Sequence, residues 1–70
     1  MDNRLQKIGK NIRRIRKERL LCQIDLAVTV GIDRAYLSEI ENGKTNTSIN
    51  ILLAIADALD VSIVKLLDVE

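Results

Sequence analysis

The apolar residues of this chain recur at helical spacing along almost its whole length. In the N-terminal part they lie three or four residues apart, which places them on one face of a helix from about residue 4 to residue 19. The residues of this stripe are Leu5, Ile8, Ile12 and Ile15. Most other positions of that segment are lysine or arginine. The pattern therefore predicts an amphipathic helix with a basic outer surface.

Shorter apolar patterns predict four further helices, at about 23–30, 34–42, 49–59 and 63–67. Gly31 and Gly43 follow the first two of these, and glycine readily takes the left-handed backbone that closes a helix. Asp33 stands where the second must begin, because its carboxylate can accept from free backbone N–H groups. Cys22 precedes the first, at a position where serine, threonine, aspartate or asparagine caps better, so we expect a weak cap there. The inward residues of the two helices are Leu26, Ala27, Val30, Leu37 and Ile40.

The predicted helix at 49–59 is apolar on nearly every side. Its expected inward stripe consists of Ile49, Leu52, Leu53, Ala56 and Leu59. A helix of this kind should be buried on two sides, and a 70-residue monomer has no second layer to cover it. We therefore expect a second copy of the chain to cover it. The residues expected at that dimer interface are Ile51, Ile55, Ala58, Val64 and Leu67.

Composition bounds the fold class and excludes several kinds of chemistry. The chain makes one domain, residues 1–70, and it reads as all-α because Tyr36 is its one aromatic residue and proline is absent. One cysteine without histidine argues against a thiol nucleophile, a zinc site or a Ser-His-Asp arrangement. No phosphate-binding glycine loop is present either, so we expect no enzyme activity, metal, cofactor or small-molecule ligand.

The sequence also predicts where the protein acts. No apolar run is long enough to span a bilayer, and no signal-peptide pattern is present. We therefore expect no membrane association and a cytoplasmic location, in a bacterium or a phage-infected cell, near the nucleoid.

The net charge of +1 hides a strong asymmetry. Residues 1–19 contain eight lysines or arginines and two acids, a charge of +6, whereas residues 20–70 contain three bases and eight acids, a charge of −5. A positive end on a neutral protein fits local contact with a polyanion such as DNA. A solvated amphipathic helix would carry the same charges, so the charge pattern alone leaves both interpretations open.

The segment 23–44 carries the most direct indication of function. Two short helices joined by a tight turn have the geometry of a helix-turn-helix, in which one helix enters the DNA major groove and the other braces it. The outer side of the 34–42 helix is small and polar, which fits a groove, although an ordinary exposed helix face has the same character. Its residues are Arg34, Ala35, Ser38 and Asn42, with Glu39 at the edge.

The run IGKNIRRIRKERLLCQIDLAVTVGIDRAYLSEIENGK, followed by an apolar helix and ALDVS, resembles the Cro- and phage-repressor-type helix-turn-helix regulators, the XRE family. The likeness extends from about Leu5 to Leu67, and segment 33–38 also resembles the controller proteins of restriction–modification systems. The resemblance implies a compact five-helix bundle of the lambda-repressor-like type and a regulator that binds double-stranded DNA. The family usually has Ser or Thr where Cys22 stands, and often Pro where Thr47 stands. Both departures affect helix starts rather than residues that face DNA.

The resemblance further implies two sets of DNA contacts. An arginine at the start of the 34–42 helix can bond guanine O6 and N7 in a bidentate way, and its neighbours would read adjacent base edges. The implied base-reading residues are Arg34, Ala35, Ser38 and Glu39. Phosphate contacts set register rather than sequence choice, and the implied residues are Gln23, Tyr36, Asn42, Lys44, Asn46 and Arg13. Tyr36 is read equally well as a half-buried packing residue with an exposed hydroxyl.

The resemblance also pairs Arg16 with Glu41 in a partly buried ion pair that links the first helix to the end of the third. Glu41 would then be structural despite its place beside the reading face.

Two functions follow from these observations. The leading hypothesis is a transcriptional regulator that binds a near-palindromic operator as a homodimer, with its helix-turn-helix at 23–42 and its dimerisation surface within 49–70. The alternative is an antitoxin-like or other protein-interaction module, whose apolar C-terminal surface binds a different protein. A stable homodimer in sedimentation favours the first hypothesis, and a monomer favours the second.

Overall fold

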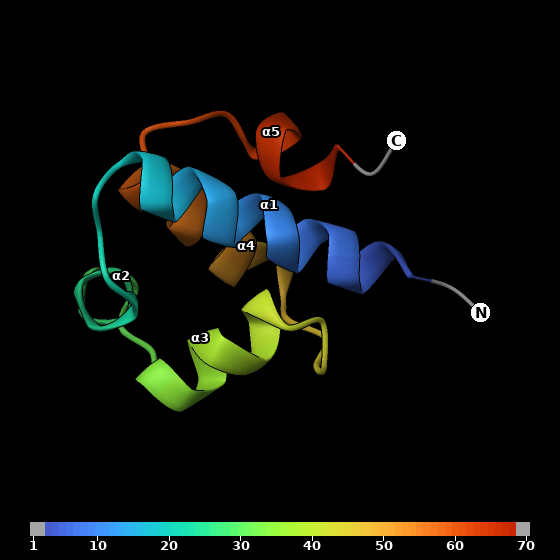
Figure 1. Ribbon diagram of the computed structural model, residues 1–70, viewed down its shortest axis with the longest axis horizontal. Coiled ribbons are helices and arrows are strands. Elements are labelled where there is room, and N and C mark those ends of the chain that lie inside the picture. Colours follow the sequence, from blue (N-terminus) through green and yellow to red (C-terminus); the bar gives the residue numbers. More distant parts are fainter. Residues whose placement is uncertain (1–2, 69–70) are drawn as a thin grey trace.

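Five helices form at the places that the apolar spacing predicts. The computed structural model describes residues 3–68, and within this range it contains no strand. Figure 1 shows the helices in chain order: α1 (Arg4–Glu18), α2 (Gln23–Val30), α3 (Arg34–Glu41), α4 (Ile49–Ala58) and α5 (Ile63–Leu67). The first, third and fourth end one residue earlier than predicted, which is within the usual fraying of helix ends.

Local side chains and backbone conformations set most of these boundaries. Gly31 (φ 86°) and Gly43 (φ 70°) take the left-handed backbone that closes α2 and α3. The hydroxyls of Ser48 and Ser62 each accept a backbone N–H at 3.2 Å, which caps the starts of α4 and α5. Asp33 does precede α3, but its carboxylate accepts no capping hydrogen bond, so that part of the prediction is wrong. The exposed carboxylate interacts with the positive end of α3 from solvent instead.

Gly9, in the middle of α1, allows α1 and α3 to approach closely. A Cβ atom at this position would collide with the backbone carbonyl oxygens of Ile40 and Glu41 at the end of α3. Glycine lowers the helix propensity of α1, but it lets the backbone of α1 pack directly against that of α3.

The core draws buried side chains from all five helices. Its apolar members are Ile12, Ile15, Leu26, Ala27, Leu37, Ile40, Leu52, Ile55, Ala56, Leu59 and Leu66. Leu5, which the predicted stripe of α1 includes, is 41% exposed because the first turn of α1 extends beyond the helices that cover the rest of it.

The buried face of α4 differs from the prediction. Ile55 is fully buried in the protein's own core, so its expected place at a dimer interface is wrong. Ile49 and Leu53, which were expected in the core, are 55% and 43% exposed. The physical reason is that α2 and α5 both pack against α4 and cover the side on which Ile55 lies. The chain thus supplies part of the second layer that the sequence analysis assigned to another copy.

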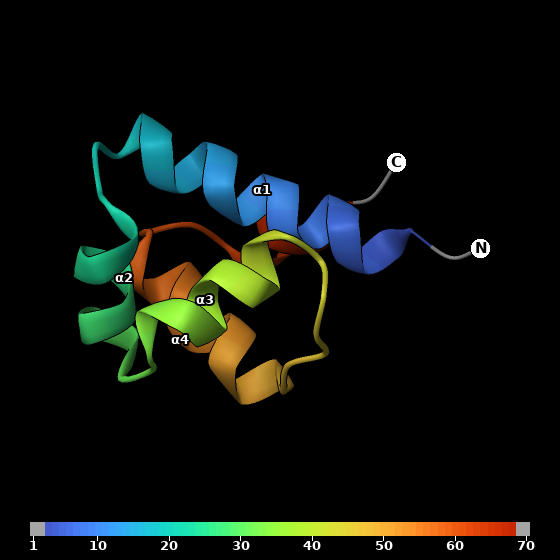
Figure 2. The same ribbon diagram turned by 60° about the horizontal axis from the view of Figure 1, so that its bottom comes forward.

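Helix α1 lies between α3 and α5. It contacts both, while α2 packs on α3 and α4. In Figure 1 α3 lies below α1 and α5 above it, and Figure 2 brings α3 to the front with α5 behind α1. None of the described helices is long and apolar enough to cross a membrane.

Candidate nucleic-acid interface

Helix α3 has one side in the core and one side open to solvent, with half-buried residues between them. Leu37 and Ile40 are buried, whereas Arg34, Ala35 and Glu39 are exposed, and Ser38 is half-buried. In Figure 2 this helix lies in front, with no other helix over its outer side. The four residues expected to read bases therefore lie on one eight-residue helix, on the side that is open to solvent or at its edge.

A buried ion pair anchors the end of this helix to α1. Arg16 donates to Glu41 through Nε at 2.7 Å and through Nη2 at 3.0 Å, in the two-bond geometry that suits guanidinium and carboxylate. The Arg16 side chain is 8% exposed and that of Glu41 1% exposed. Arg16 Nη1 also donates to the Leu21 carbonyl at 2.8 Å, which fastens the turn before α2. The pair implied by the family resemblance is therefore present and buried.

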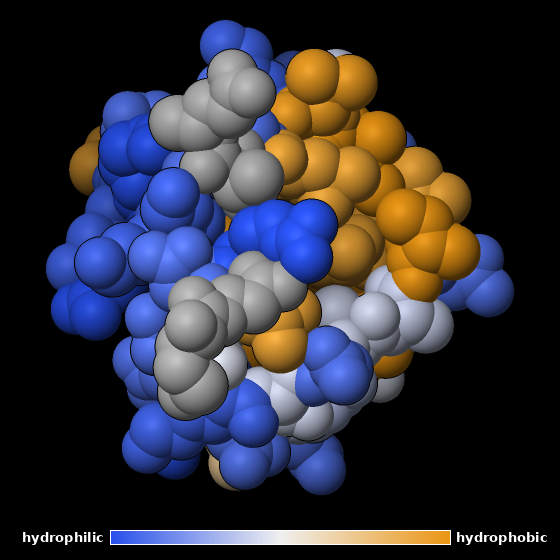
Figure 3. All heavy atoms as spheres, turned by 90° about the vertical axis from the view of Figure 1, so that its right-hand side faces the viewer, coloured by the Kyte–Doolittle hydropathy of each residue, from blue (hydrophilic) through white to orange (hydrophobic). Residues whose placement is uncertain are grey.

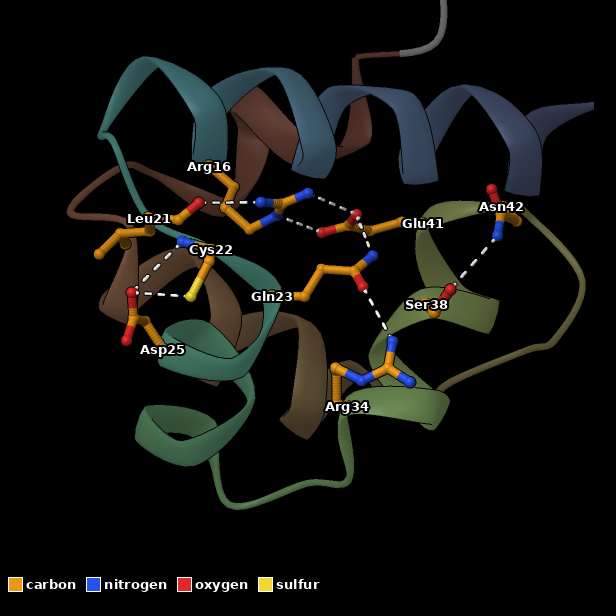
Figure 4. A network of polar contacts seen from close by, with 9 residues as sticks. All are labelled: Arg16, Leu21, Cys22, Gln23, Asp25, Arg34, Ser38, Glu41 and Asn42. Carbon is orange, nitrogen blue, oxygen red and sulfur yellow. Dashed lines mark hydrogen bonds and ion pairs between the residues drawn. The ribbon is translucent and has the colours of Figure 1, made fainter.

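The same carboxylate orients the first residue of α2. Gln23 Nε2 donates to Glu41 Oε1 at 3.0 Å, and Gln23 Oε1 accepts from Arg34 Nη1 at 3.4 Å (Figure 4). Because a carboxylate only accepts, Glu41 fixes which end of the Gln23 amide faces it and so turns the amide oxygen toward Arg34. One N–H of the amide remains for a phosphate. The family resemblance implied a phosphate contact for Gln23, which stays a prediction, but it did not indicate the link that Gln23 makes between Glu41 and Arg34.

The turn after α3 carries three further predicted contacts. Asn42, Lys44 and Asn46 are all exposed. Asn42 Nδ2 lies 3.5 Å from Ser38 Oγ, and the Lys44 backbone N–H donates to the Glu39 carbonyl at 2.9 Å. This turn is therefore fastened to α3, with its polar side chains on the surface.

Tyr36 has features of both roles considered for it, the phosphate contact and the half-buried packing residue. Its ring packs against the core and is half-buried, while its hydroxyl lies 3.1 Å from Thr47 Oγ1 and 3.4 Å from the Asn46 carbonyl. The side chain thus joins α3 to the loop before α4.

Arg13 is the one predicted phosphate contact on α1. It is exposed and takes no part in the network that joins Arg16 to Arg34. The network therefore brings together residues of α1, α2 and α3, with Arg13 outside it.

The start of α2 contains a contact that sequence reasoning missed. The Asp25 carboxylate accepts from the Cys22 thiol at 3.0 Å and from the Cys22 backbone N–H at 3.3 Å. These two hydrogen bonds, the thiol first, hold the pKa of Asp25 below its usual value of 3.8. An acid three residues after the N-cap is half of the capping-box signature, whose other half, a serine or threonine, is replaced here by Cys22. The Asp25 carboxylate therefore ties down the start of α2, for which Cys22 itself provides no side-chain capping hydrogen bond.

Comparison with known proteins settles what these helices are. A sequence model of the helix-turn-helix family matches residues 12–66. This chain belongs to that family. The helix-turn-helix chain is 41% identical over 56 residues to the immunity repressor protein of Bacillus phage phi105, a match that spans 80% of this chain and 39% of the repressor.

Solved structures of regulators in this family have the same fold as this chain. The restriction–modification controller protein C.AhdI from Aeromonas hydrophila has a TM-score of 0.86 at 37% identity, covering 89% of this chain and 94% of that one. SinR, a master regulator for biofilm formation solved in complex with DNA, has a TM-score of 0.80 at 44% identity, covering 87% of this chain and 98% of that one. The predictions of the fold and of the phage-repressor-type family are confirmed. The family consists of DNA-binding transcriptional regulators, repressors and controller proteins among them, rather than enzymes.

Proposed function

We propose that this protein is a sequence-specific transcriptional regulator that binds a near-palindromic operator as a homodimer, with α3 in the major groove. The observation that carries the proposal is the outer side of α3. It is exposed, small and polar, and it begins with an arginine that the Gln23 amide oxygen faces. The relation to SinR, which was solved with DNA, supports the same assignment.

The base-reading and phosphate roles divide along the site. Arg34 leads α3 and would bond O6 and N7 of a guanine, a contact worth ~1–3 kcal/mol of discrimination. Ala35, Ser38 and Glu39 would meet neighbouring base edges. The phosphate contacts would come from residues around this helix: Gln23, Tyr36, Asn42, Lys44, Asn46 and, on α1, Arg13.

The homodimer follows from apolar surface that the chain leaves uncovered. Ile49 and Leu53 on α4 and Val64 and Leu67 on α5 are between 39% and 70% exposed. Figure 3 shows apolar side chains gathered on one side of the molecule, above the polar lower edge where α3 lies. Ile51 and Ala58 are half-buried and would lie at the margin. A surface apart from the reading helix leaves α3 free while two copies join.

Charges near this surface favour a second copy as its partner. Asp57 is exposed one turn after Leu53, and Lys65 is exposed beside Val64. In a two-fold interface, when residue i of one copy meets residue j of the other, j also meets i, so an acid and a base placed on either side of the axis can pair twice across it. Two such copies would place their α3 helices ~34 Å apart, in successive major grooves.

The test is the sequence preference of Arg34→Ala. Operator sites are first selected from random DNA at a stated salt concentration, and binding is then measured on selected and random duplexes. We expect the ratio between the two affinities to fall by about tenfold or more, because the base contact is lost together with the hydrogen bond that Arg34 donates to Gln23 Oε1. The matched control is Lys44→Ala, which should weaken binding to both duplexes equally. An equal loss for Arg34→Ala on both would refute the base-reading role.

A further inference from the structure

One buried polar side chain belongs neither to the proposed DNA contacts nor to the Arg16–Glu41 ion pair. Asn11 is on α1 and is 9% exposed. Its Nδ2 donates to the backbone carbonyl of Leu66 at 3.1 Å and to that of Asp68 at 2.7 Å. Its Oδ1 accepts from Arg14 Nη1 at 3.2 Å. Asn11 Nδ2 therefore makes both of these hydrogen bonds to the end of α5, more than fifty residues away along the chain.

The end of α5 needs such a partner. The last carbonyl groups of any helix receive no hydrogen bond from within that helix. A helix of five residues is also far too short to be stable alone. Asp68, which follows α5, has an extended backbone, so α5 lacks the left-handed cap that Gly31 gives to α2. The Asn11 amide supplies the hydrogen bonds that a cap would otherwise provide.

These bonds also fix the rotation of α5 about its own axis. Leu66 is fully buried, whereas its neighbours Val64 and Leu67 are 70% and 39% exposed. Side chains and carbonyls of a helix turn together, because both are set by the same backbone. Holding the Leu66 and Asp68 carbonyls against α1 therefore determines where Val64 and Leu67 point.

We propose that Asn11 is a positioning residue for self-association, which sets the α5 part of the surface that meets a second copy. This inference rests on the proposed homodimer. In a two-fold interface the same patch is used by both copies. A small rotation of α5 therefore displaces the apolar side chains on both sides of the interface.

Arg14 completes the arrangement by fixing the direction of the Asn11 amide. A guanidinium only donates, so Oδ1 turns toward Arg14 and Nδ2 toward α5. Arg14 also lies 3.9 Å from Glu18 in an exposed ion pair. Each of the two contacts of Arg14 can be removed separately, which provides a matched control.

The first experiment compares Asn11→Asp with the wild-type chain by sedimentation over a concentration series. The substitution keeps the shape of the side chain and removes both N–H donors. We expect the dimer dissociation constant to rise by about tenfold, because the α5 part of the surface is displaced in both copies. The melting temperature of the diluted, monomeric chain is measured alongside, because a purely structural role would lower that temperature and leave the dissociation constant of folded chains unchanged. An unchanged dissociation constant overturns the inference.

A second pair of variants decides the matter should Asn11→Asp fail to fold. Arg14→Met removes the partner of Oδ1, and Glu18→Gln removes only the exposed ion pair. We expect dimerisation to weaken in Arg14→Met and to stay at the wild-type level in Glu18→Gln. Equal dimerisation in the two variants overturns the inference.

A third variant separates this inference from the homodimer itself. Val64→Ser lowers the apolar character of the proposed surface without touching Asn11. Weaker dimerisation in Val64→Ser together with normal dimerisation in Asn11→Asp refutes the role of Asn11 alone. A wild-type monomer, or full dimerisation in Val64→Ser, refutes the proposed interface and the inference with it.

Discussion

Replacing Glu41 by alanine should unfold this domain rather than merely weaken its DNA binding. The substitution removes both hydrogen bonds from Arg16, at 2.7 and 3.0 Å, and the one from Gln23 at 3.0 Å. The Arg16 guanidinium, 8% exposed, would then be left in the interior with the Leu21 carbonyl as its described partner. A buried charge that loses its counter-ion in this way costs ~3–5 kcal/mol.

That loss is large compared with the stability of so small a domain. At ~0.05–0.15 kcal/mol per residue, a chain of 70 residues has a free energy of unfolding of ~4–10 kcal/mol. The expected change removes between a third and all of it. In thermal terms the melting temperature should fall by at least about 12 °C, since 1 kcal/mol corresponds to ~4–8 °C at this size.

Circular dichroism during heating and in urea measures the effect directly. Glu39→Ala is the matched control, because Glu39 lies on the same helix and is exposed. It should melt close to the wild-type temperature. A normal melting temperature for Glu41→Ala would refute the structural role.

A double substitution separates the ion pair from the network beyond it. Arg16→Met combined with Glu41→Leu replaces both charges by apolar side chains, which is often neutral or stabilising. We expect a folded domain in which the Gln23 amide has lost its acceptor. Its preference for selected over random DNA should fall, because the amide no longer holds its oxygen toward Arg34. A double variant that folds and keeps the full preference would show that Glu41 contributes stability alone.

Two further predictions concern single positions. Gly9→Ala would stabilise an ordinary helix interior by ~0.5–1 kcal/mol, but here the new Cβ meets backbone carbonyls of Ile40 and Glu41, so we expect a loss of ~1–3 kcal/mol in urea titration. A stabilised variant would contradict the close packing of α1 on α3. The pKa of Asp25 is lowered from 3.8, so its contribution to stability is complete above that pH and is lost as the pH falls through the lowered value. Asp25→Asn should therefore reduce the acid loss of stability in melts between about pH 2 and 6, and an unchanged acid profile would exclude the Cys22 contact as its cause.

The sequence predicted the helices well because their signals are local. Apolar spacing and two glycines act within one or two turns of the chain, so the bounds of all five helices lie within one residue of the prediction. The side chains of α3 also lie as the wheel places them, because a helix with one apolar and one polar side has a single way to face the core.

Prediction failed where packing between distant elements decides the outcome. Helix α4 is apolar on several sides, so periodicity cannot tell which side the core will take. Helix α4 packs against α2 and α5 in such a way that Ile55 is buried, while Ile49 and Leu53 remain exposed to solvent. The hydrogen bonds of Asn11 to the end of α5 could not be predicted either, because the two partners lie more than fifty residues away along the chain.

The described contacts make α1 the element that relates the two proposed surfaces. Glu41 and the close approach at Gly9 fix α3 on one side of α1, and Asn11 fixes α5 on the other. In the proposed complex, α3 reads the half-site and α5 helps to join the two copies. The distance between two reading helices must match one turn of DNA, ~34 Å, and it is set by how α3 and α5 are placed relative to each other. A rigid placement also means that less conformational freedom is lost on binding, which favours affinity without any added contact. In the proposed complex we therefore expect the basic helix to contribute chiefly as the scaffold that holds both surfaces in register, and less through the number of its charges.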